Sequence, residues 1–334
     1  MNLKSFFYLL LFFFIDELGF SKILSTFALN IILYVFMNKI VECVPNFSEG
    51  RDLEKIDCIV NVFRAKKNVK LLNYSNDKDH NRMVVTVIGE PEAIKNTMLE
   101  AVGVAIKHIN LTHHNGQHPR LGAADVIPFI PLKDMTFDEA DILAKDFGKA
   151  LAEKYNLPVY LYEKSASAAH RHNLAAVRKG EFEGLTEKMK QQEWKPNFGP
   201  EKPHPTAGAS VVGARMPLIA FNVNLNSTKF EIAEKIAKKV RFIGGGLPFC
   251  KAIAIDLKEK NLMQVSMNLT DYTQTSIHQA VEMIRVEAQR FGVTISGCEL
   301  IGLVPLQAVV DTASYYLGLQ DFSAKHILET HLME

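Results

Sequence analysis

Cysteine is scarce in this sequence, and its spacing excludes two structural roles. The 334 residues contain four cysteines, and no two of them form a CxxC pair. Zinc sites and disulfide frameworks depend on regularly spaced cysteines, so the sequence indicates neither of them. A reducing compartment, the cytoplasm, is the simplest expectation for such a chain.

Net charge is almost absent as well. The 38 lysines and arginines nearly balance the 37 acidic residues, which leaves a net charge of +1. Such a chain has no overall field for nucleic acid or for an acidic membrane, and we expect no nucleic-acid partner. The motifs GxxxxGK[ST], GxGxxG and GxSxG are also missing. The sequence therefore does not indicate a nucleotide-binding or serine-hydrolase site of the kinds that these motifs build.

Strongly hydrophobic runs are confined to residues 1–36. The runs 5–15 and 23–36 are each shorter than the roughly 18–20 residues that a membrane helix needs. Three interpretations of this apolar extension stay open: a start placed upstream of the natural one at Met37, a membrane anchor, or an export signal without a clean cleavage site. Prediction of the fold therefore begins at Met37.

From there the hydrophobic pattern predicts an α/β fold with two similar halves. Strands at 39–44, 69–74, 83–88 and 126–130 alternate with helices at 52–64 and 91–109. The resulting order, strand, helix, strand, strand, helix, strand, is the ferredoxin-like βαββαβ arrangement. It recurs after residue 217, with strands at 218–224, 252–257, 263–269 and 293–296, helices at 228–240 and 275–291, and a last helix at 305–319. We expect two subdomains, at 38–216 and 217–334.

Additional elements are predicted between the two halves. Thr136 and Glu139 form a capping-box pattern that opens a helix to about residue 155. A strand at 159–162 and two short helices, at 168–178 and 185–192, follow. The stretch 194–213 contains four prolines and is predicted to be a long ordered loop. Loops of this length inside a domain often carry function.

The segment 115–125 is the strongest candidate for chemistry. It brings together the imidazole of His118, the guanidinium of Arg120 and the carboxylate of Asp125, and Pro119 stiffens its backbone. A histidine titrates near neutral pH, so it can accept and return a proton. On its own the pattern also fits a loop histidine that caps the preceding helix. The nearby His114 would face His118 only within one helix, which Asn115 and Gly116 interrupt, so no metal site is expected.

Two other segments have a functional and a structural interpretation. Arg82 could bind a substrate carboxylate or form a salt bridge within its turn. Ser48 is a candidate helix cap, and the helix that it would open could also receive an anion. The proline-stiffened loop 199–208, with Lys202 and His204, could line a flat ligand or could simply link the two halves.

Five segments together resemble the formiminotransferase domain of folate enzymes. They occur in the family's order and span residues 39–319, at 41–50, 116–122, 194–200, 218–224 and 302–305. The resemblance implies two subdomains with mixed sheets that face each other across a ligand cleft, with the helices outside. It also implies a homodimer.

The resemblance further implies a reaction. A formimino group passes from N-formimino-L-glutamate to N5 of tetrahydrofolate, which gives 5-formimidoyltetrahydrofolate and L-glutamate, a step of histidine degradation and one-carbon metabolism. Tetrahydrofolate is the co-substrate, and no metal is implied. Because the chain ends soon after the transferase domain, we expect a separate cyclodeaminase to act downstream. Two alternatives are a related transferase with another formimino or formyl donor, and a folate-binding protein without catalysis.

The family's functional residues fall on particular positions of this sequence. The catalytic acid–base histidine falls on His118. Arg82, Arg120 and Arg215, together with Lys202, are the candidate cations for the carboxylates of the substrates. The folate-contacting loop comprises Gly199, Pro200, Glu201, Lys202, Pro203, His204, Pro205, Thr206, Ala207 and Gly208.

Overall fold

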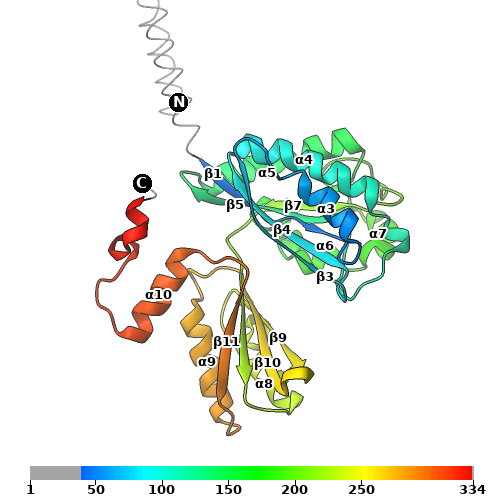
Figure 1. The fold of residues 1–334 in the computed structure, drawn as a ribbon. Coiled ribbons are helices and arrows are strands. Elements are labelled where there is room, and N and C mark those ends of the chain that lie inside the picture. Colours follow the sequence, from blue (N-terminus) through cyan, green and yellow to red (C-terminus); the bar gives the residue numbers. More distant parts are fainter. Residues whose placement is uncertain (1–38, 333–334) are drawn as a thin grey trace, which may run out of the picture. The chain divides into compact units, whose positions relative to one another are not determined.

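The computed structural model describes residues 39–332, so the apolar segment 1–36 and its three interpretations lie outside the described residues. The chain divides into two compact units, the first ending at Arg215 and the second starting at Met216 (Figure 1). Within 39–332, no helix is both long enough and apolar enough to cross a membrane.

The first unit contains the predicted order of elements and several additions. Its strands are β1 (Ile40–Cys43), β2 (Asn46–Phe47), β3 (Val69–Asp77), β4 (Arg82–Gly89), β5 (Ala124–Lys133), β6 (Val159–Leu161) and β7 (Ser210–Ala214). Its α-helices are α3 (Leu53–Asn61), α4 (Pro91–His108), α5 (Phe137–Tyr155), α6 (Leu174–Arg178) and α7 (Glu181–Met189).

These strands form one seven-stranded sheet. It is mixed, as predicted for this half, but the prediction lacked β2 and β7. The first strand, β1, pairs antiparallel with both β4 and β5, and β3 pairs with the other edge of β4. This pairing gives the strand order of the split βαβ arrangement. Beyond β5 the sheet continues through β7 to β6, and both of these pairings are parallel.

The strand β7 corrects one prediction, because four of its five residues fall in the stretch 194–213 that was expected to be a loop. All five of its residues, Ser-Val-Val-Gly-Ala, are buried. A strand buried on both faces shows no alternation of polar and apolar residues, so small side chains next to prolines were interpreted as loop.

Helices cover both faces of this sheet at one end. The main core lies between the sheet and the helices α3, α4 and α5, around Val85, Ile94 and Phe147. A second cluster, which includes Val126, Val177, Tyr160, Leu185 and Val211, joins α6 and α7 to the opposite face of β5, β7 and β6. The helices α6 and α7 therefore cover the second face of the sheet over β5, β7 and β6.

The second unit has the predicted order of elements too. It consists of β8 (Ile219–Leu225), α8 (Phe230–Val240), β9 (Cys250–Leu257), β10 (Leu262–Leu269), α9 (Ile277–Gln289), β11 (Ile295–Ile301) and α10 (Leu306–Leu317). The strands form one sheet in the order β11, β8, β10, β9. Its core, around Val223, Val265, Ile236 and Ile284, lies between this sheet and the helices α8 and α9.

A mixed sheet was predicted for this unit, and that was wrong: all three of its strand pairings are antiparallel. In a βαββαβ unit, each strand is antiparallel to its neighbours. The mixed character of the first sheet comes from the added strands β6 and β7, and the second unit has no counterpart of them among its described residues.

The longest helix of the first unit, α5, starts at its predicted cap, whereas α3 and α8 do not start as predicted. Thr136 and Glu139 form the capping box that opens α5. In contrast, Asp52 caps α3, where Ser48 was the candidate cap, because Asp52 accepts hydrogen bonds from the backbone of Glu54 and Lys55. The helix α8 begins at Phe230, two residues after its predicted start at 228, and Lys229 occupies the cap position without a side-chain hydrogen bond.

Candidate active site

The histidine loop, residues 115–125, is held to the loop after β1. Ser48 donates one hydrogen bond from its hydroxyl to Gly122 O, 2.8 Å away, and one from its backbone to Ala123 O, 2.9 Å away. Gly122 lies so close to the chain that an added Cβ would be 2.0 Å from Ala209 O. The structural role of Ser48 is therefore to fix the histidine loop, which it reaches across 74 positions of the sequence.

Asn81 connects the same loop to the turn before β4. This buried side chain accepts a hydrogen bond from Gly50 N at 2.9 Å and donates one to Asn115 O at 3.0 Å. Its backbone carbonyl lies 2.9 Å from Nε2 of His114. Asn81 also has a positive φ of 49°, a conformation that asparagine tolerates better than most residues. The sequence pattern gave Asn81 no role.

Arg82, the first residue of β4, points to the candidate catalytic histidine. Its Nη1 lies 3.2 Å from Nε2 of His118. A guanidinium can only donate, so Nε2 accepts and a neutral imidazole carries its proton on Nδ1. The structure thus brings together two residues that lie 36 positions apart in the sequence and that were predicted separately.

His118 is held in its neutral form. Burial is the main cause that lowers its pKa to about 3, and the positive charges of Arg82 and Arg178 contribute to the same shift. The imidazole is therefore neutral at physiological pH, but with so low a pKa it accepts a proton only weakly in this arrangement.

Arg178, the last residue of α6, is a further member of this group. It forms an ion pair with the buried carboxylate of Asp125, whose other oxygen accepts a hydrogen bond from Leu121 N at 2.6 Å. Within the described residues, the Nε of Arg178 is one of four buried side-chain nitrogen or oxygen atoms without a hydrogen-bond partner. Sequence analysis missed Arg178, because nothing in the pattern of 168–178 distinguishes this arginine from a surface residue.

The other predicted cations lie in different surroundings. The nearly buried guanidinium of Arg120 forms ion pairs with Glu181 at 2.9 Å and with Glu183 at 2.6 Å, and so joins the histidine loop to α7. Arg215 lies beside Glu42 and hydrogen-bonds the side chain of the buried Tyr162. A carboxylate-binding role for Arg120 and Arg215 stays a prediction, and Arg82 is the predicted arginine that the structure places in contact with His118.

The proline-rich loop 199–208 is folded against the histidine loop. Its turn is closed by reciprocal backbone hydrogen bonds between His204 and Gly208, at 2.9 and 3.0 Å. The Nδ1 of His204 accepts a hydrogen bond from Ala207 N at 3.0 Å. Burial lowers the pKa of His204, so the ring is neutral and carries its proton on Nε2. Within this loop Lys202 is exposed, and Glu201 pairs with Lys195 at 2.9 Å.

Two backbone hydrogen bonds dock this loop. Thr206 O accepts from Leu111 N at 2.8 Å, and Ala207 O accepts from Ala123 N at 2.9 Å. The loop therefore belongs structurally to the first unit and runs alongside the histidine loop.

A cavity of about 700 Å³ lies beside the histidine loop, lined by residues 112–116, Arg120, Gly180, Glu181 and Glu183. Among residues 39–332, no group of three or more histidine, cysteine or acidic side chains is placed to hold a metal ion.

Comparison with known proteins identifies the family. Residues 40–215 match the formiminotransferase domain, N-terminal subdomain, and residues 220–332 match the formiminotransferase domain. Together the two matches cover most of the chain, which therefore belongs to the formiminotransferase domain family.

Individual relatives extend over nearly the whole chain. The glutamate formimidoyltransferase of Streptococcus pyogenes serotype M1 is 46% identical over 298 residues, which are 89% of this chain and 100% of that protein. The glutamate formimidoyltransferase of Thermoplasma acidophilum is 46% identical over 292 residues, or 87% of this chain and 96% of that protein. The formimidoyltransferase-cyclodeaminase of Rattus norvegicus is 46% identical over 286 residues, which are 84% of this chain and 53% of that protein.

Proposed function

We propose that this chain transfers a formimino group from N-formimino-L-glutamate to N5 of tetrahydrofolate, with His118 as the acid–base residue. The chain is a glutamate formimidoyltransferase, since both units match the family and two relatives of that name align over nearly their full length. The observation that carries the role of His118 is its neutral, largely buried imidazole, hydrogen-bonded to Arg82.

Proton transfer explains why a histidine is needed. When the folate amine attacks the formimino carbon, it must lose a proton, and the departing glutamate nitrogen must gain one. A neutral imidazole can take the first proton and deliver it to the leaving nitrogen. General acid–base catalysis of this kind contributes about 10²–10⁴ in rate.

Arg82, which lies beside His118, can couple binding of the donor to catalysis. In the described structure the N–H of Arg82 occupies the lone pair of Nε2, and its charge opposes protonation. A substrate carboxylate that binds Arg82 would draw this N–H away and offset the charge. Nε2 would then be free to accept a proton, and the pKa of His118 would rise towards neutrality.

Arg178 can supply a second donor to the same carboxylate. Its Nε has no partner among the described residues, and its charge acts on His118. The ion pair with Asp125 fixes the other side of the guanidinium. Two arginines on one carboxylate would orient the donor as well as bind it.

The folate site is proposed at the loop 199–208. Its closed turn and its two hydrogen bonds to the neighbouring backbone support a preformed wall beside His118. With it we propose a formiminotransferase N-terminal subdomain at 38–216 and a C-terminal subdomain at 217–334. A cytoplasmic location, a metal-free reaction and a separate downstream cyclodeaminase stay predictions.

Assay of the purified chain with three donors tests the reaction. We expect transfer to tetrahydrofolate from formiminoglutamate and much slower transfer from formiminoglycine or formylglutamate. Faster transfer from one of the other donors would favour a related transferase. Tight folate binding without turnover of any donor would favour a folate-binding protein without catalysis.

A further inference from the structure

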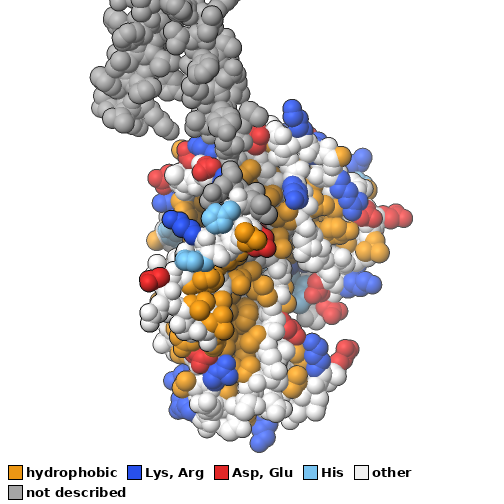
Figure 2. Space-filling view, turned by 60° about the vertical axis from the view of Figure 1, so that its left-hand side comes forward, with side chains coloured by type: hydrophobic (Ala, Val, Ile, Leu, Met, Phe, Trp, Pro, Cys, Tyr) orange, Lys and Arg blue, Asp and Glu red, His pale blue; other side chains and the backbone are white. Residues whose placement is uncertain are grey.

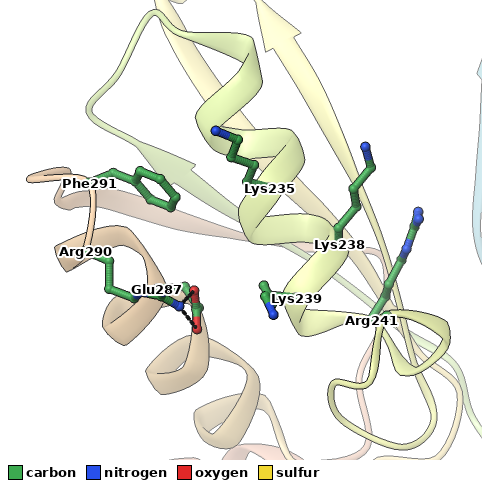
Figure 3. A pocket seen from close by; sticks show the side chains of 8 residues that line it. Lys235, Lys238, Lys239, Arg241, Glu287, Arg290 and Phe291 are labelled. Carbon is green, nitrogen blue, oxygen red and sulfur yellow. Dashed lines mark hydrogen bonds and ion pairs between the residues drawn. The ribbon is translucent and has the colours of Figure 1, made fainter.

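The helical side of the second unit contains a strongly basic cavity. It has a volume of about 430 Å³ and lies between α8, the turn after it and the end of α9 (Figure 3). Its charged lining comprises five cations and a single carboxylate, in a chain whose overall charges nearly cancel. These residues are Lys235, Lys238, Lys239, Arg241, Arg290 and Glu287.

Only two of the five cations are neutralised by neighbours. Lys238 pairs with Glu234 at 2.9 Å, and Arg290 pairs with Glu287 at 2.9 Å. For Lys235, Lys239 and Arg241, no carboxylate of residues 39–332 lies within ion-pair distance.

Arg241 also lacks, among the described residues, a hydrogen-bond partner for one of its side-chain donors. This donor, the Nε, is buried. Burial of a donor without a partner is unfavourable, and a ligand that accepts this hydrogen bond would remove that cost.

Stabilisation of the helix alone explains only part of this arrangement. Lys238 and Lys239 lie in the last turn of α8, where positive charge offsets the helix dipole. Lys235 lies one turn earlier, with its ammonium 5.8 Å from the centre of the Phe291 ring, and Arg290 comes from a different helix. Positive side chains therefore line the cavity from α8, from the turn after it and from the end of α9.

We propose that this cavity binds a compact anion that carries two or more phosphate groups. Its volume is within the range of small-molecule sites. A phosphate monoester concentrates a charge of about −1.5 to −2 on three acceptor oxygens, which suits several lysines and an arginine better than a single carboxylate does. The same chemistry occurs in free polyphosphates and in phosphorylated lipid headgroups.

Two exposed apolar side chains stand next to the cavity, in the turn after α8. Phe242 is 62% exposed and Ile243 is 83% exposed. If the phosphates belong to a lipid headgroup, these two side chains would enter the apolar layer of the membrane. If the ligand is free in solution, they would stay in water.

Titration of the full chain with inorganic tripolyphosphate tests the proposal. We expect saturable binding by calorimetry that weakens with salt, and about tenfold weaker binding in Lys239→Glu. Lys149→Glu, which makes the same charge change at an exposed position of α5 in the other unit, is the matched control and should bind like the unchanged chain. If Lys239→Glu does not fold, Lys235→Gln replaces it, with several-fold weaker binding expected.

Vesicles separate the two sources of phosphate. Phosphatidylcholine vesicles with and without phosphatidylinositol bisphosphate are compared for the unchanged chain and for Lys239→Glu. Binding that needs the bisphosphate, is lost in the variant and is competed by tripolyphosphate indicates a headgroup; tripolyphosphate binding alone indicates a free ligand. Equal affinities of the unchanged chain and Lys239→Glu, binding of neither probe, or tighter binding of citrate than of tripolyphosphate would overturn the proposal.

Discussion

At the scale of single residues, the charge of Arg82 adds to burial in keeping His118 neutral. The guanidinium lies 3.2 Å from Nε2, and its charge is one cause of the low pKa of this histidine. For Arg82→Gln we therefore expect a higher pKa of His118, visible in an NMR titration of its ring protons. We also expect the KM for formiminoglutamate to rise by about tenfold or more, because a charged hydrogen bond to its carboxylate is lost.

Arg82→Lys is the matched variant, because it keeps the positive charge and loses the planar fork. It should leave the pKa of His118 low while still raising the KM for the donor. An unchanged KM in both variants would exclude Arg82 as a ligand of the substrate carboxylate.

The low pKa of His118 also predicts how stability depends on pH. The folded chain keeps this ring neutral down to about pH 3, whereas an unfolded chain protonates it near pH 6.5. Between these values the unfolded state binds more protons, so this contribution to stability is complete above pH 6.5 and is lost as the pH falls towards 3.

His118→Asn removes that contribution, so its stability should fall less between pH 7 and about pH 5 than the stability of the unchanged chain does. Urea unfolding at the two pH values measures the difference. A parallel loss in both proteins would show that the folded chain accepts the proton on His118 without cost.

How far the site could be predicted is clearest at these residues. His118 and Arg82 were both singled out, because each stands in an unusual local segment. Their contact could not be predicted, since it depends on the pairing of β4 within the sheet. Arg178 and Asn81 act through burial and hydrogen bonds to distant backbone, which no local spacing reveals.

At the scale of elements, the loop 199–208 depends on the glycine that ends it. Gly208 has a positive φ of 68°, and an added Cβ would lie 2.1 Å from Leu121 O. We expect Gly208→Ala to lower the free energy of unfolding by about 3 kcal/mol, because the backbone at this position must move away from Leu121 to make room for the methyl group. It should also weaken tetrahydrofolate binding.

Gly184→Ala on α7 is the matched control. An added Cβ there would have no atom within 4 Å, and the position is helical. Alanine should stabilise the chain by about 0.5–1 kcal/mol, as measured by urea unfolding. Similar effects of the two substitutions would contradict the role given to the turn at Gly208.

Among the elements, the ones with clear periodicity were predicted best. The βαββαβ order of each unit and the capping box of α5 are present as predicted. The buried strand β7 was missed because it has neither alternation nor bulky side chains. Ser48 was taken for a cap because its hydroxyl stands before a helix, whereas its actual partner is Gly122 in another loop.

At the scale of the whole molecule, α10 offers a surface for the predicted homodimer. Leu306, Val309 and Leu317 recur at a spacing that places them on one face of α10, and they are 40%, 45% and 70% exposed. Hydrophobic side chains also gather broadly on the face shown in Figure 2. Apolar patches of this kind commonly mark protein–protein contacts.

If a second copy covers this face, Val309→Glu should convert a dimer to a monomer in light scattering at matched concentration. Ile142→Glu on α5, where the native side chain is 59% exposed, is the control and should leave the dimer intact. A monomeric unchanged chain, or a dimer that tolerates Val309→Glu, would remove α10 from the interface.

The division into two α/β units could be predicted because the hydrophobic pattern repeats. The strand β6 was predicted as well, at 159–162, and so were the four strands of the second sheet. The strands β2 and β7 were not predicted, because β2 has only two residues and β7 falls in the proline-rich stretch that was interpreted as a loop. The parallel pairing of β7 with β5 and β6 makes the first sheet mixed, whereas the second sheet is antiparallel.

The turnover of His118→Ala tests the acid–base role of His118 most directly. With formiminoglutamate and tetrahydrofolate, we expect the variant to keep its fold and its affinity for tetrahydrofolate while kcat falls by about 10²–10⁴. A kcat equal to that of the unchanged chain would show that His118 does not transfer the proton.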